Sequence, residues 1–156
     1  MSDKPIKIKK STCADTRSCD YASVTKRQLA SATMDHISDV TKGINLFKKW
    51  LDMAAANHDL TKLGMLDRFH KEFTEGFKKS QEWLHDHWTH ERHHLMSHVP
   101  EDVDLVDVVE MAVDLSMSAA ARSGEMFKVE VPNEVLQKAF ENTMKRLYNS
   151  VEVEDG

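Results

Sequence analysis

The sequence predicts an all-α fold, arranged as a compact single-domain bundle of five or six helices. Apolar residues recur at helical spacing along most of the chain, as Val40, Ile44, Phe47 and Leu51 do at i, i+4, i+7 and i+11. We find no internal repeat and no convincing alternation of the kind that a sheet would need. With 156 residues, of which 40% are hydrophobic, the chain is long enough to bury a core.

The predicted helices follow one another with short connections. His36 lies on the first apolar stripe, one turn before Val40, and Gly43 is a point where this helix could break or bend. Further helices are predicted over residues 60–77, 80–98, 104–122 and about 132–147. Pro100 ends one of them and Pro132 begins the last, because proline cannot donate the backbone hydrogen bond of an internal helical position.

The two ends of the chain are polar. We expect residues 1–22 to form a flexible basic arm, residues 23–150 the helical domain and residues 151–156 an acidic tail. Residues 1–28 carry seven Lys and Arg against three Asp, whereas the net charge of the whole chain is −5. General nucleic-acid binding through counterion release is therefore not expected.

Cysteine content and hydropathy favour a cytoplasmic protein. Cys13 and Cys19 are the only cysteines, and two cysteines in a polar arm make a poor disulfide framework. No apolar run approaches the ~20 residues that a membrane-spanning helix needs.

Histidine and carboxylate residues are the candidates for chemistry. The chain has nine His, five of them between His85 and His94. Imidazole and carboxylate groups bind borderline divalent metals near neutral pH, so separated segments of this kind predict a metal site that folding assembles. His58-Asp59 falls at a predicted helix junction, with Lys62 one turn beyond Asp59. The structural alternative is that Asp59 simply caps the next helix.

An acidic stripe lies further along the chain. Asp107, Glu110 and Asp114 are spaced i, i+3, i+7 on a helix that is otherwise rich in Leu, Val, Met and Ala. A solvated helix face explains such a stripe equally well. The second set of candidate ligands at His58-Asp59 weakens that explanation.

The histidine-rich segment also fits a protease pattern. His90-Glu91-Arg92-His93-His94 matches H-E-x-x-H, in which two His on one helical face bind zinc and the Glu is the general base. A metalloprotease of the zincin type is thus a third hypothesis.

In order along the chain, His36, His58-Asp59 and Asp114 resemble the H…HD…D ligand set of the HD-domain metal-dependent phosphohydrolases. The resemblance is sharper to a small uncharacterised HD-like family of phage and bacterial proteins and spans about residues 36–123. Its blocks correspond here to His36-Ile37-x-x-Val40, His58-Asp59-x-Thr61-Lys62, Arg92-His93-His94 and Asp104-Leu105-x-Asp107-x-x-Glu110-Met111-x-x-Asp114. The chain departs from the family's usual residues at Thr61, Glu91 and Leu115.

The resemblance implies an all-α hydrolase of a nucleotide or another small phosphate ester. It places His36, His58, Asp59 and Asp114 on a divalent ion, with His93 and His94 on a second ion or on the phosphate. We expect Lys62 and Arg92 to neutralise phosphate oxygens. Glu110 would accept a proton or orient a ligand His. The ligand set suits Mn, Fe, Co, Ni or Zn, as one or two ions.

Two further expectations complete this interpretation. The alternative function is a non-catalytic module that binds a nucleotide or a protein, with a structural or vestigial metal site. The partner would otherwise be a small phosphorylated substrate in the cytoplasm (the host cytoplasm for a phage protein), and a homo-oligomer is compatible with the sequence. His36 and His58 are 22 residues apart, so a shared ion requires the chain to turn back between them, near Gly43 or within residues 52–57. One unbroken helix from His36 to His58 would exclude the HD assignment.

Overall fold

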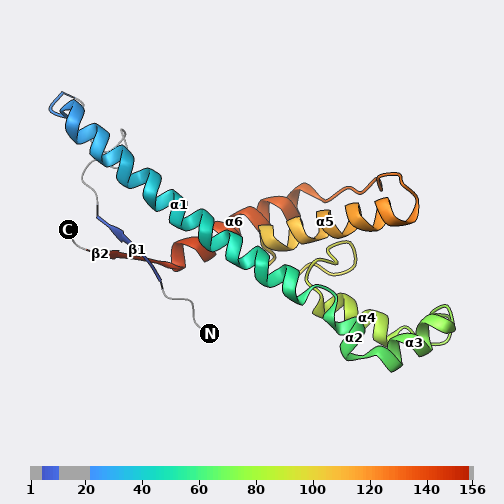
Figure 1. Cartoon of the computed structure of the whole chain (residues 1–156). Coiled ribbons are helices and arrows are strands. Elements are labelled where there is room, and N and C mark those ends of the chain that lie inside the picture. Colours follow the sequence, from blue (N-terminus) through green and yellow to red (C-terminus); the bar gives the residue numbers. More distant parts are fainter. Residues whose placement is uncertain (1–4, 11–21, 155–156) are drawn as a thin grey trace. The chain divides into compact units, whose positions relative to one another are not determined.

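Helices make up most of the chain in the computed structural model, which describes residues 5–10 and 22–154 (Figure 1). Along the sequence they are α1 (Lys26–Asn57), α2 (Leu60–Gly64), α3 (Leu66–Thr74), α4 (Glu82–His90), α5 (Leu105–Arg122) and α6 (Asn133–Asn149). The predicted all-α class is confirmed. Cys13 and Cys19 lie outside the described residues.

The chain divides into two compact units instead of one bundle with unstructured ends. One unit comprises residues 1–49 and 145–156, and the other comprises residues 50–144. In the first unit, strand β1 (Ile6–Lys9) pairs in parallel with strand β2 (Val151–Glu154), and Lys7 Nζ lies 2.6 Å from Glu154 Oε1. The prediction of a free arm and a free tail is therefore wrong over these residues. Each strand is too short to give a recognisable period, and the pairing joins opposite ends of the sequence.

Helix α1 is continuous over 32 residues, so the expected turn or bend near Gly43 or within residues 52–57 does not occur. At 1.5 Å of rise per residue, the 22 residues from His36 to His58 correspond to about 33 Å. Two ligands of one metal ion cannot lie that far apart. The expectation that His36 shares an ion with His58 of the same chain is therefore wrong.

The two helices predicted next are shorter than expected. The first is divided into α2 and α3 at Met65, and α3 ends before Gly76 and Phe77, which both have left-handed backbone (φ 61° and 55°). Helix α4 ends at His90, because Glu91 takes an extended conformation (φ −87°, ψ 102°). The residues from Glu91 to His98 therefore follow the helix and do not continue it.

The core of the second unit joins α5 and α6 to the segment that follows α4. Its buried members are Leu95, Val103, Met111, Val135 and Ala139. A capping box fixes the start of α5, where the Asp104 side chain accepts hydrogen bonds from the backbone and the Asp107 side chain accepts one from the Asp104 backbone. This arrangement holds α5 with Glu110 and Asp114 on the side of the site described next.

Candidate metal centre

The site begins at the connection between α1 and α2. Asp59 has left-handed backbone (φ 57°) and makes no side-chain cap to α2, so the capping explanation of this residue is wrong. Its carboxylate forms an ion pair with Lys62 and points towards a group of histidines. A non-glycine residue in this conformation is uncommon and is held there by its surroundings.

Four imidazole rings gather around the Asp59 carboxylate. Its Oδ1 lies 3.4 Å from His87 Nε2 and 3.9 Å from His93 Nε2. Its Oδ2 lies 3.5 Å from His58 Nε2, on the other side. His94 Nε2 lies 2.8 Å from His87 Nε2. The Nε2 atoms of residues from three segments thus converge on one carboxylate.

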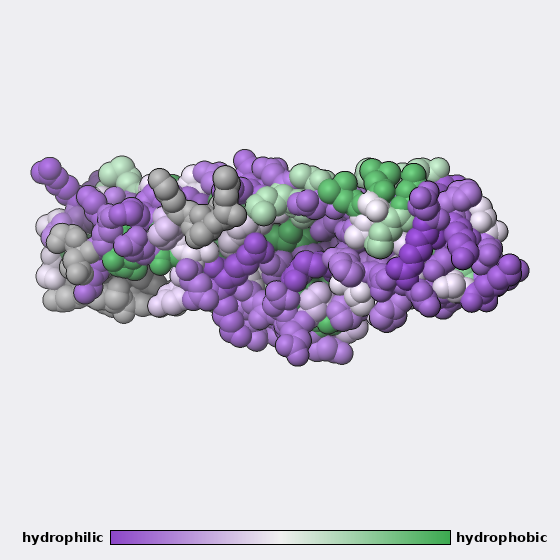
Figure 2. Space-filling view, turned by 90° about the horizontal axis from the view of Figure 1, so that it is seen from below, coloured by the Kyte–Doolittle hydropathy of each residue, from purple (hydrophilic) through white to green (hydrophobic). Residues whose placement is uncertain are grey.

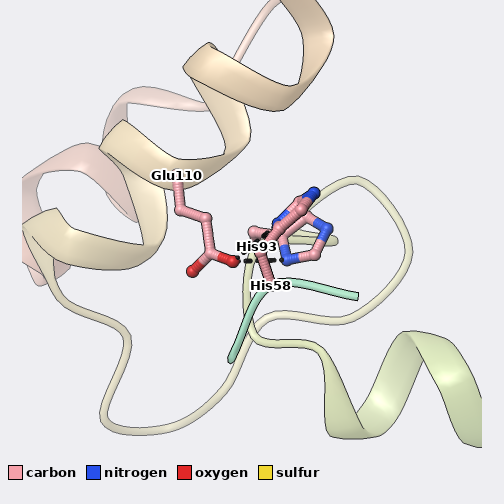
Figure 3. A group of neighbouring side chains, drawn as sticks. All are labelled: His58, His93 and Glu110. Carbon is pink, nitrogen blue, oxygen red and sulfur yellow. Dashed lines mark hydrogen bonds and ion pairs between the residues drawn. The ribbon is translucent and has the colours of Figure 1, made fainter. Parts of the chain in front are cut away.

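The other ring nitrogens of these histidines, the Nδ1 atoms, contact side chains on the far side of the rings from Asp59. Glu110 Oε1 lies 2.9 Å from His58 Nδ1 and 3.1 Å from His93 Nδ1 (Figure 3). His87 Nδ1 lies 2.7 Å from the Thr61 hydroxyl, which donates to Glu91 Oε1 at 2.6 Å. Partners of this kind behind a metal-binding histidine fix its tautomer and its orientation.

Buried polar atoms without hydrogen-bond partners and an excess of negative charge indicate that the cluster could bind a cation. Asp59 Oδ1 and His93 Nε2 are buried without a hydrogen-bond partner, and His93 Nδ1 has only its ion-pair contact with Glu110. Buried polar atoms are normally satisfied, so such orphans need an explanation, and a cation between them supplies one. The carboxylates of Asp59, Glu91, Glu110 and Asp114 outnumber the one ammonium group of Lys62, which also favours a bound cation.

Burial and neighbouring charges shift the pKa values of the clustered histidines. Burial, together with the neighbouring His93 and His87, lowers the pKa of His94 to about 4. Burial also lowers the pKa of His87. Burial opposes the charged form of His93, but Glu110, Asp59 and Asp114 outweigh it and raise the pKa of that ring. His87 and His94 are thus held neutral, which is the form that binds metal.

Three overlapping sets of donor atoms lie within 4.8 Å of one another in the described part of the chain. They are His58, His93 and Glu110; Asp59, His93 and His94; and Asp59, His87 and Glu91. Because Asp59 and His93 each belong to two sets, the cluster can hold one ion or two adjacent ions. Nitrogen and carboxylate donors together suit Mn, Fe, Co, Ni or Zn.

Most of the residues that the sequence predicted lie in this cluster. His58, Asp59, His93 and His94 line it, and Asp114 Oδ1 lies 3.7 Å from His58 Nε2. Glu110 and Lys62 contact these residues as described above. The acidic stripe on α5 is not a solvated face, because Asp107 is buried and Glu110 and Asp114 are half-buried.

Arg92 does not point its charge at the cluster. Its guanidinium donates to both carboxylate oxygens of Asp107, each at 2.8 Å, and to Asp102 at 2.9 Å. These bonds explain why the pKa of Arg92 is raised. Its expected role on phosphate is corrected to a structural one, since its donors are engaged in anchoring the segment after α4 to α5.

The zincin pattern is not realised. The helix that would carry both histidines ends at His90, so His90 and His94 do not share a helical face. His90 is exposed and its Nδ1 contacts the Asp86 carbonyl, while Glu91 bonds to Thr61. The H-E-x-x-H match is therefore a coincidence within a histidine-rich segment.

Sequence reasoning did not assign His87, Glu91 and Thr61 to the site. The signal for Thr61 was its place in the block His58-Asp59-x-Thr61-Lys62. The spacing grouped His87 with His90 and His94 on one predicted helical face and left His85 as a surface residue, but it did not show which of the three would face the site. Only the turn after α4 brings His94 back to His87.

Comparisons with family models, with curated proteins and with solved structures find no match to this chain. None of the helices described here combines the length and the apolar character that crossing a membrane requires. Of the ligands that the HD resemblance implied, His58, Asp59, His93, His94 and Asp114 lie near one another. The unbroken helix α1 keeps His36 away from them, so the H…HD…D ligand set is not assembled within one chain.

Proposed function

We propose that this protein is a metal-dependent phosphohydrolase acting on a nucleotide or another small phosphate ester. The observation that carries the proposal is the gathering of four histidines around Asp59, where buried polar atoms lack hydrogen-bond partners. The Nε2 atoms of His58, His87 and His93 face its carboxylate, and His94 lies beside His87. A bound divalent ion would lower the pKa of its water to near 7 and supply hydroxide at neutral pH.

The residues of the cluster have separate roles in metal binding, in orienting the rings and in substrate binding. Asp59 and the four histidines hold the metal, and Glu110 and Thr61 orient the rings. Lys62 lies at the edge of the site with its side chain 37% exposed, so its ammonium can reach a phosphate oxygen of a substrate. Asp114 adds a carboxylate beside His58.

The charge of the site bears on the number of ions. Four carboxylates and one lysine leave a local charge of −3 with neutral histidines. One divalent ion leaves this sum negative, whereas two make it positive. The charge count therefore favours two ions for an anionic phosphate ester, and the three overlapping donor sets have room for a carboxylate shared between them.

The test is metal analysis of protein purified without a histidine tag or chelator, alongside Asp59→Ala. We expect near-stoichiometric Mn, Fe, Co, Ni or Zn in the wild type, its loss in the variant, and phosphatase or nucleotidase turnover that falls by at least 100-fold. Asp67→Ala, at an exposed acid on α3, is the matched control and should keep both properties. Full turnover in Asp59→Ala would overturn the proposal.

A second candidate is a non-catalytic nucleotide- or protein-binding module with a structural metal site. The observation in its favour is that His87 and His93 are almost completely buried, at 2% and 1% exposure. A structural ion adds directly to folding stability, so its removal should unfold the second unit. A hydrolase should instead remain largely helical without metal and regain turnover when metal is restored.

A further inference from the structure

Trp83 is the largest of the fully buried side chains in the described part of the chain. It is 1% exposed, whereas many large apolar residues are open to solvent, among them Leu63 at 71% and Phe73 at 61%. Figure 2 shows hydrophobic side chains open on one face of the molecule among hydrophilic ones. Burial of apolar surface is therefore uneven in this protein, and the complete burial of Trp83 needs a local explanation.

The indole ring of Trp83 stacks on the imidazole ring of His87. Their ring centres lie 4.9 Å apart and their planes differ by 12°. Both residues are on α4, one helical turn apart, so the helix itself brings the two rings together. The polar atom of the indole does not explain its burial, because Trp83 Nε1 is buried without a hydrogen-bond partner, which is unfavourable. The contribution of this side chain therefore lies in its ring.

Other residues hold the Trp83 ring in its orientation. Phe69 of α3 stacks on it with ring centres 4.1 Å apart and planes that differ by 24°. Phe77, which follows α3, is parallel to it within 20° at 6.4 Å. The Trp83 backbone N–H donates to the Glu72 carboxylate at 3.0 and 3.1 Å. Both the backbone and the ring of Trp83 are thus fixed from outside α4.

Backbone strain occurs at residues that contact this pair of rings. Asp59 and Phe77 are the two non-glycine residues with left-handed backbone among those the structure describes, with φ of 57° and 55°. Asp59 Oδ1 lies 3.4 Å from His87 Nε2, and Phe77 lies parallel to Trp83. For an aromatic residue such a φ is an outlier that its surroundings must maintain. The fold therefore accepts strain on the side of His87 and on the side of Trp83.

The stacking completes the control of the His87 ring. A metal ion binds imidazole along the lone pair of a ring nitrogen, and this lone pair lies in the plane of the ring. The Thr61 hydroxyl, 2.7 Å from His87 Nδ1, fixes one point of the ring but leaves the ring free to turn about the line between these two atoms. The parallel indole of Trp83 removes that freedom.

We propose that Trp83 is a positioning residue of the metal centre, whose ring fixes the plane of His87 so that Nε2 stays directed at the Asp59 carboxylate, where the ion binds. The inference rests on the metal centre of the proposed function. It adds to that centre a residue that itself contacts neither metal nor substrate and acts through a ligand.

The test uses Co²⁺ as the probe, because its visible absorption spectrum reports the arrangement of its ligands. Trp83→Leu keeps an apolar side chain but removes the flat ring. We expect it to bind Co²⁺ at least tenfold more weakly, with a changed spectrum. Trp83→Phe keeps a flat ring and removes the unpaired donor, so its affinity should lie within about threefold of the wild type and its spectrum should be unchanged.

Trp88→Leu is the matched control, because it makes the same substitution on the same helix at a half-buried position. It should keep the affinity and the spectrum of the wild type. Circular dichroism establishes that each variant is folded under the conditions of the titration. A folded Trp83→Leu variant with wild-type affinity and spectrum overturns the inference, even where its stability is reduced. A Trp83→Phe variant as impaired as Trp83→Leu contradicts it as well.

A double-variant comparison tests whether Trp83 acts through His87. His87→Ala retains the donors of Asp59, His93 and His94, so it should still bind Co²⁺, although more weakly. Adding Trp83→Leu to His87→Ala should then change the affinity by less than about twofold, because the ring that Trp83 orients is absent. A further tenfold loss would show that Trp83 supports the site by another route.

These readouts separate the two proposals. A Co²⁺ site that depends on Trp83, in a protein that hydrolyses no phosphate ester with any metal, would leave the inference standing and sink the proposed function. Turnover of a phosphate ester by a protein whose Co²⁺ site is unaffected by Trp83→Leu would do the reverse.

Discussion

The Thr61 hydroxyl lies 2.7 Å from Nδ1 of His87. The same hydroxyl has one hydrogen, which it donates to the Glu91 carboxylate at 2.6 Å. It therefore accepts from His87, so Nδ1 of His87 carries the proton and Nε2 keeps its lone pair. That lone pair faces the Asp59 carboxylate and the His94 ring, where a metal ion would be bound.

We predict that Thr61→Val weakens metal binding by about 10- to 100-fold, because partners behind a ligand histidine have effects of this size. The valine keeps the shape of threonine but removes the group that fixes the tautomer of His87. Thr61→Ser keeps the hydroxyl and should stay close to the wild type. Competition with a metal-sensitive chelating dye measures both affinities. Equal affinities for the Val and Ser variants would show that the hydroxyl does not set the tautomer.

Arg92 gives a prediction about stability instead of substrate binding. Its guanidinium donates hydrogen bonds to both carboxylate oxygens of Asp107, whose side chain is 4% exposed. Arg92→Met leaves that buried carboxylate without its main partner, which should cost about 1–3 kcal/mol of the free energy of unfolding. Chemical denaturation measures this loss, and the metal content should stay unchanged. An unaltered stability with a raised KM would instead return Arg92 to the role on phosphate that the sequence suggested.

The sequence predicted the fold class and most of the candidate site, for different reasons. Helical periodicity in stretches such as Val40 to Leu51 and Val106 to Met111 predicts a helix with one apolar face. That face is buried on α5 at Val106 and Met111, whereas Val40 and Ile44 on α1 are exposed. His58-Asp59 was recognised because two ligand types stand together at a junction. Neither signal depends on contacts between distant parts of the chain.

What the sequence could not predict depends on such contacts. The end of α4 at His90 follows from the bond between Glu91 and Thr61, 30 residues away in the chain. The strands β1 and β2 exist only because opposite ends of the sequence pair. Gly43 suggested a bend in α1, yet the helix passes through it unbroken, since its neighbours supply helical hydrogen bonds on both sides.

His93 predicts how metal binding depends on pH. Burial opposes its protonation, but contacts with Glu110, Asp59 and Asp114 raise its pKa above the usual 6.5. A metal must displace that proton, so the apparent affinity should fall up to tenfold for each pH unit below this raised pKa, with the fall already under way at pH 6.5. His94, with a pKa of about 4, should compete only near that pH. Titration calorimetry in buffers of different ionisation enthalpy should record the release of a proton when metal binds. A metal affinity that does not change between pH 7 and 5.5 would show that metal binding is not coupled to deprotonation of His93.

Glu72 links the start of α4 to His87, a candidate metal ligand. Its buried carboxylate accepts hydrogen bonds from the Trp83 backbone N–H at 3.0 and 3.1 Å and from the Ser80 hydroxyl at 2.9 Å. Trp83 in turn stacks on His87 with ring centres 4.9 Å apart. Burial opposes the charged form of Glu72, but these hydrogen bonds outweigh it and lower its pKa.

The sign of the resulting pH dependence follows from that direction. Because the pKa of Glu72 is lower in the folded state than in the unfolded state, its contribution to stability is complete above the unfolded value of about 4.3 and is lost as pH falls through the folded value. Glu72→Gln should lower Tm by a few degrees at pH 7, with the difference from the wild type shrinking between pH 4.5 and pH 3. Thermal unfolding followed by circular dichroism measures both Tm values. Glu82→Gln, at a side chain 83% exposed, is the control and should track the wild type at every pH. A difference for Glu72→Gln that stays constant down to pH 3 would mean that the charge of this carboxylate does not stabilise the start of α4.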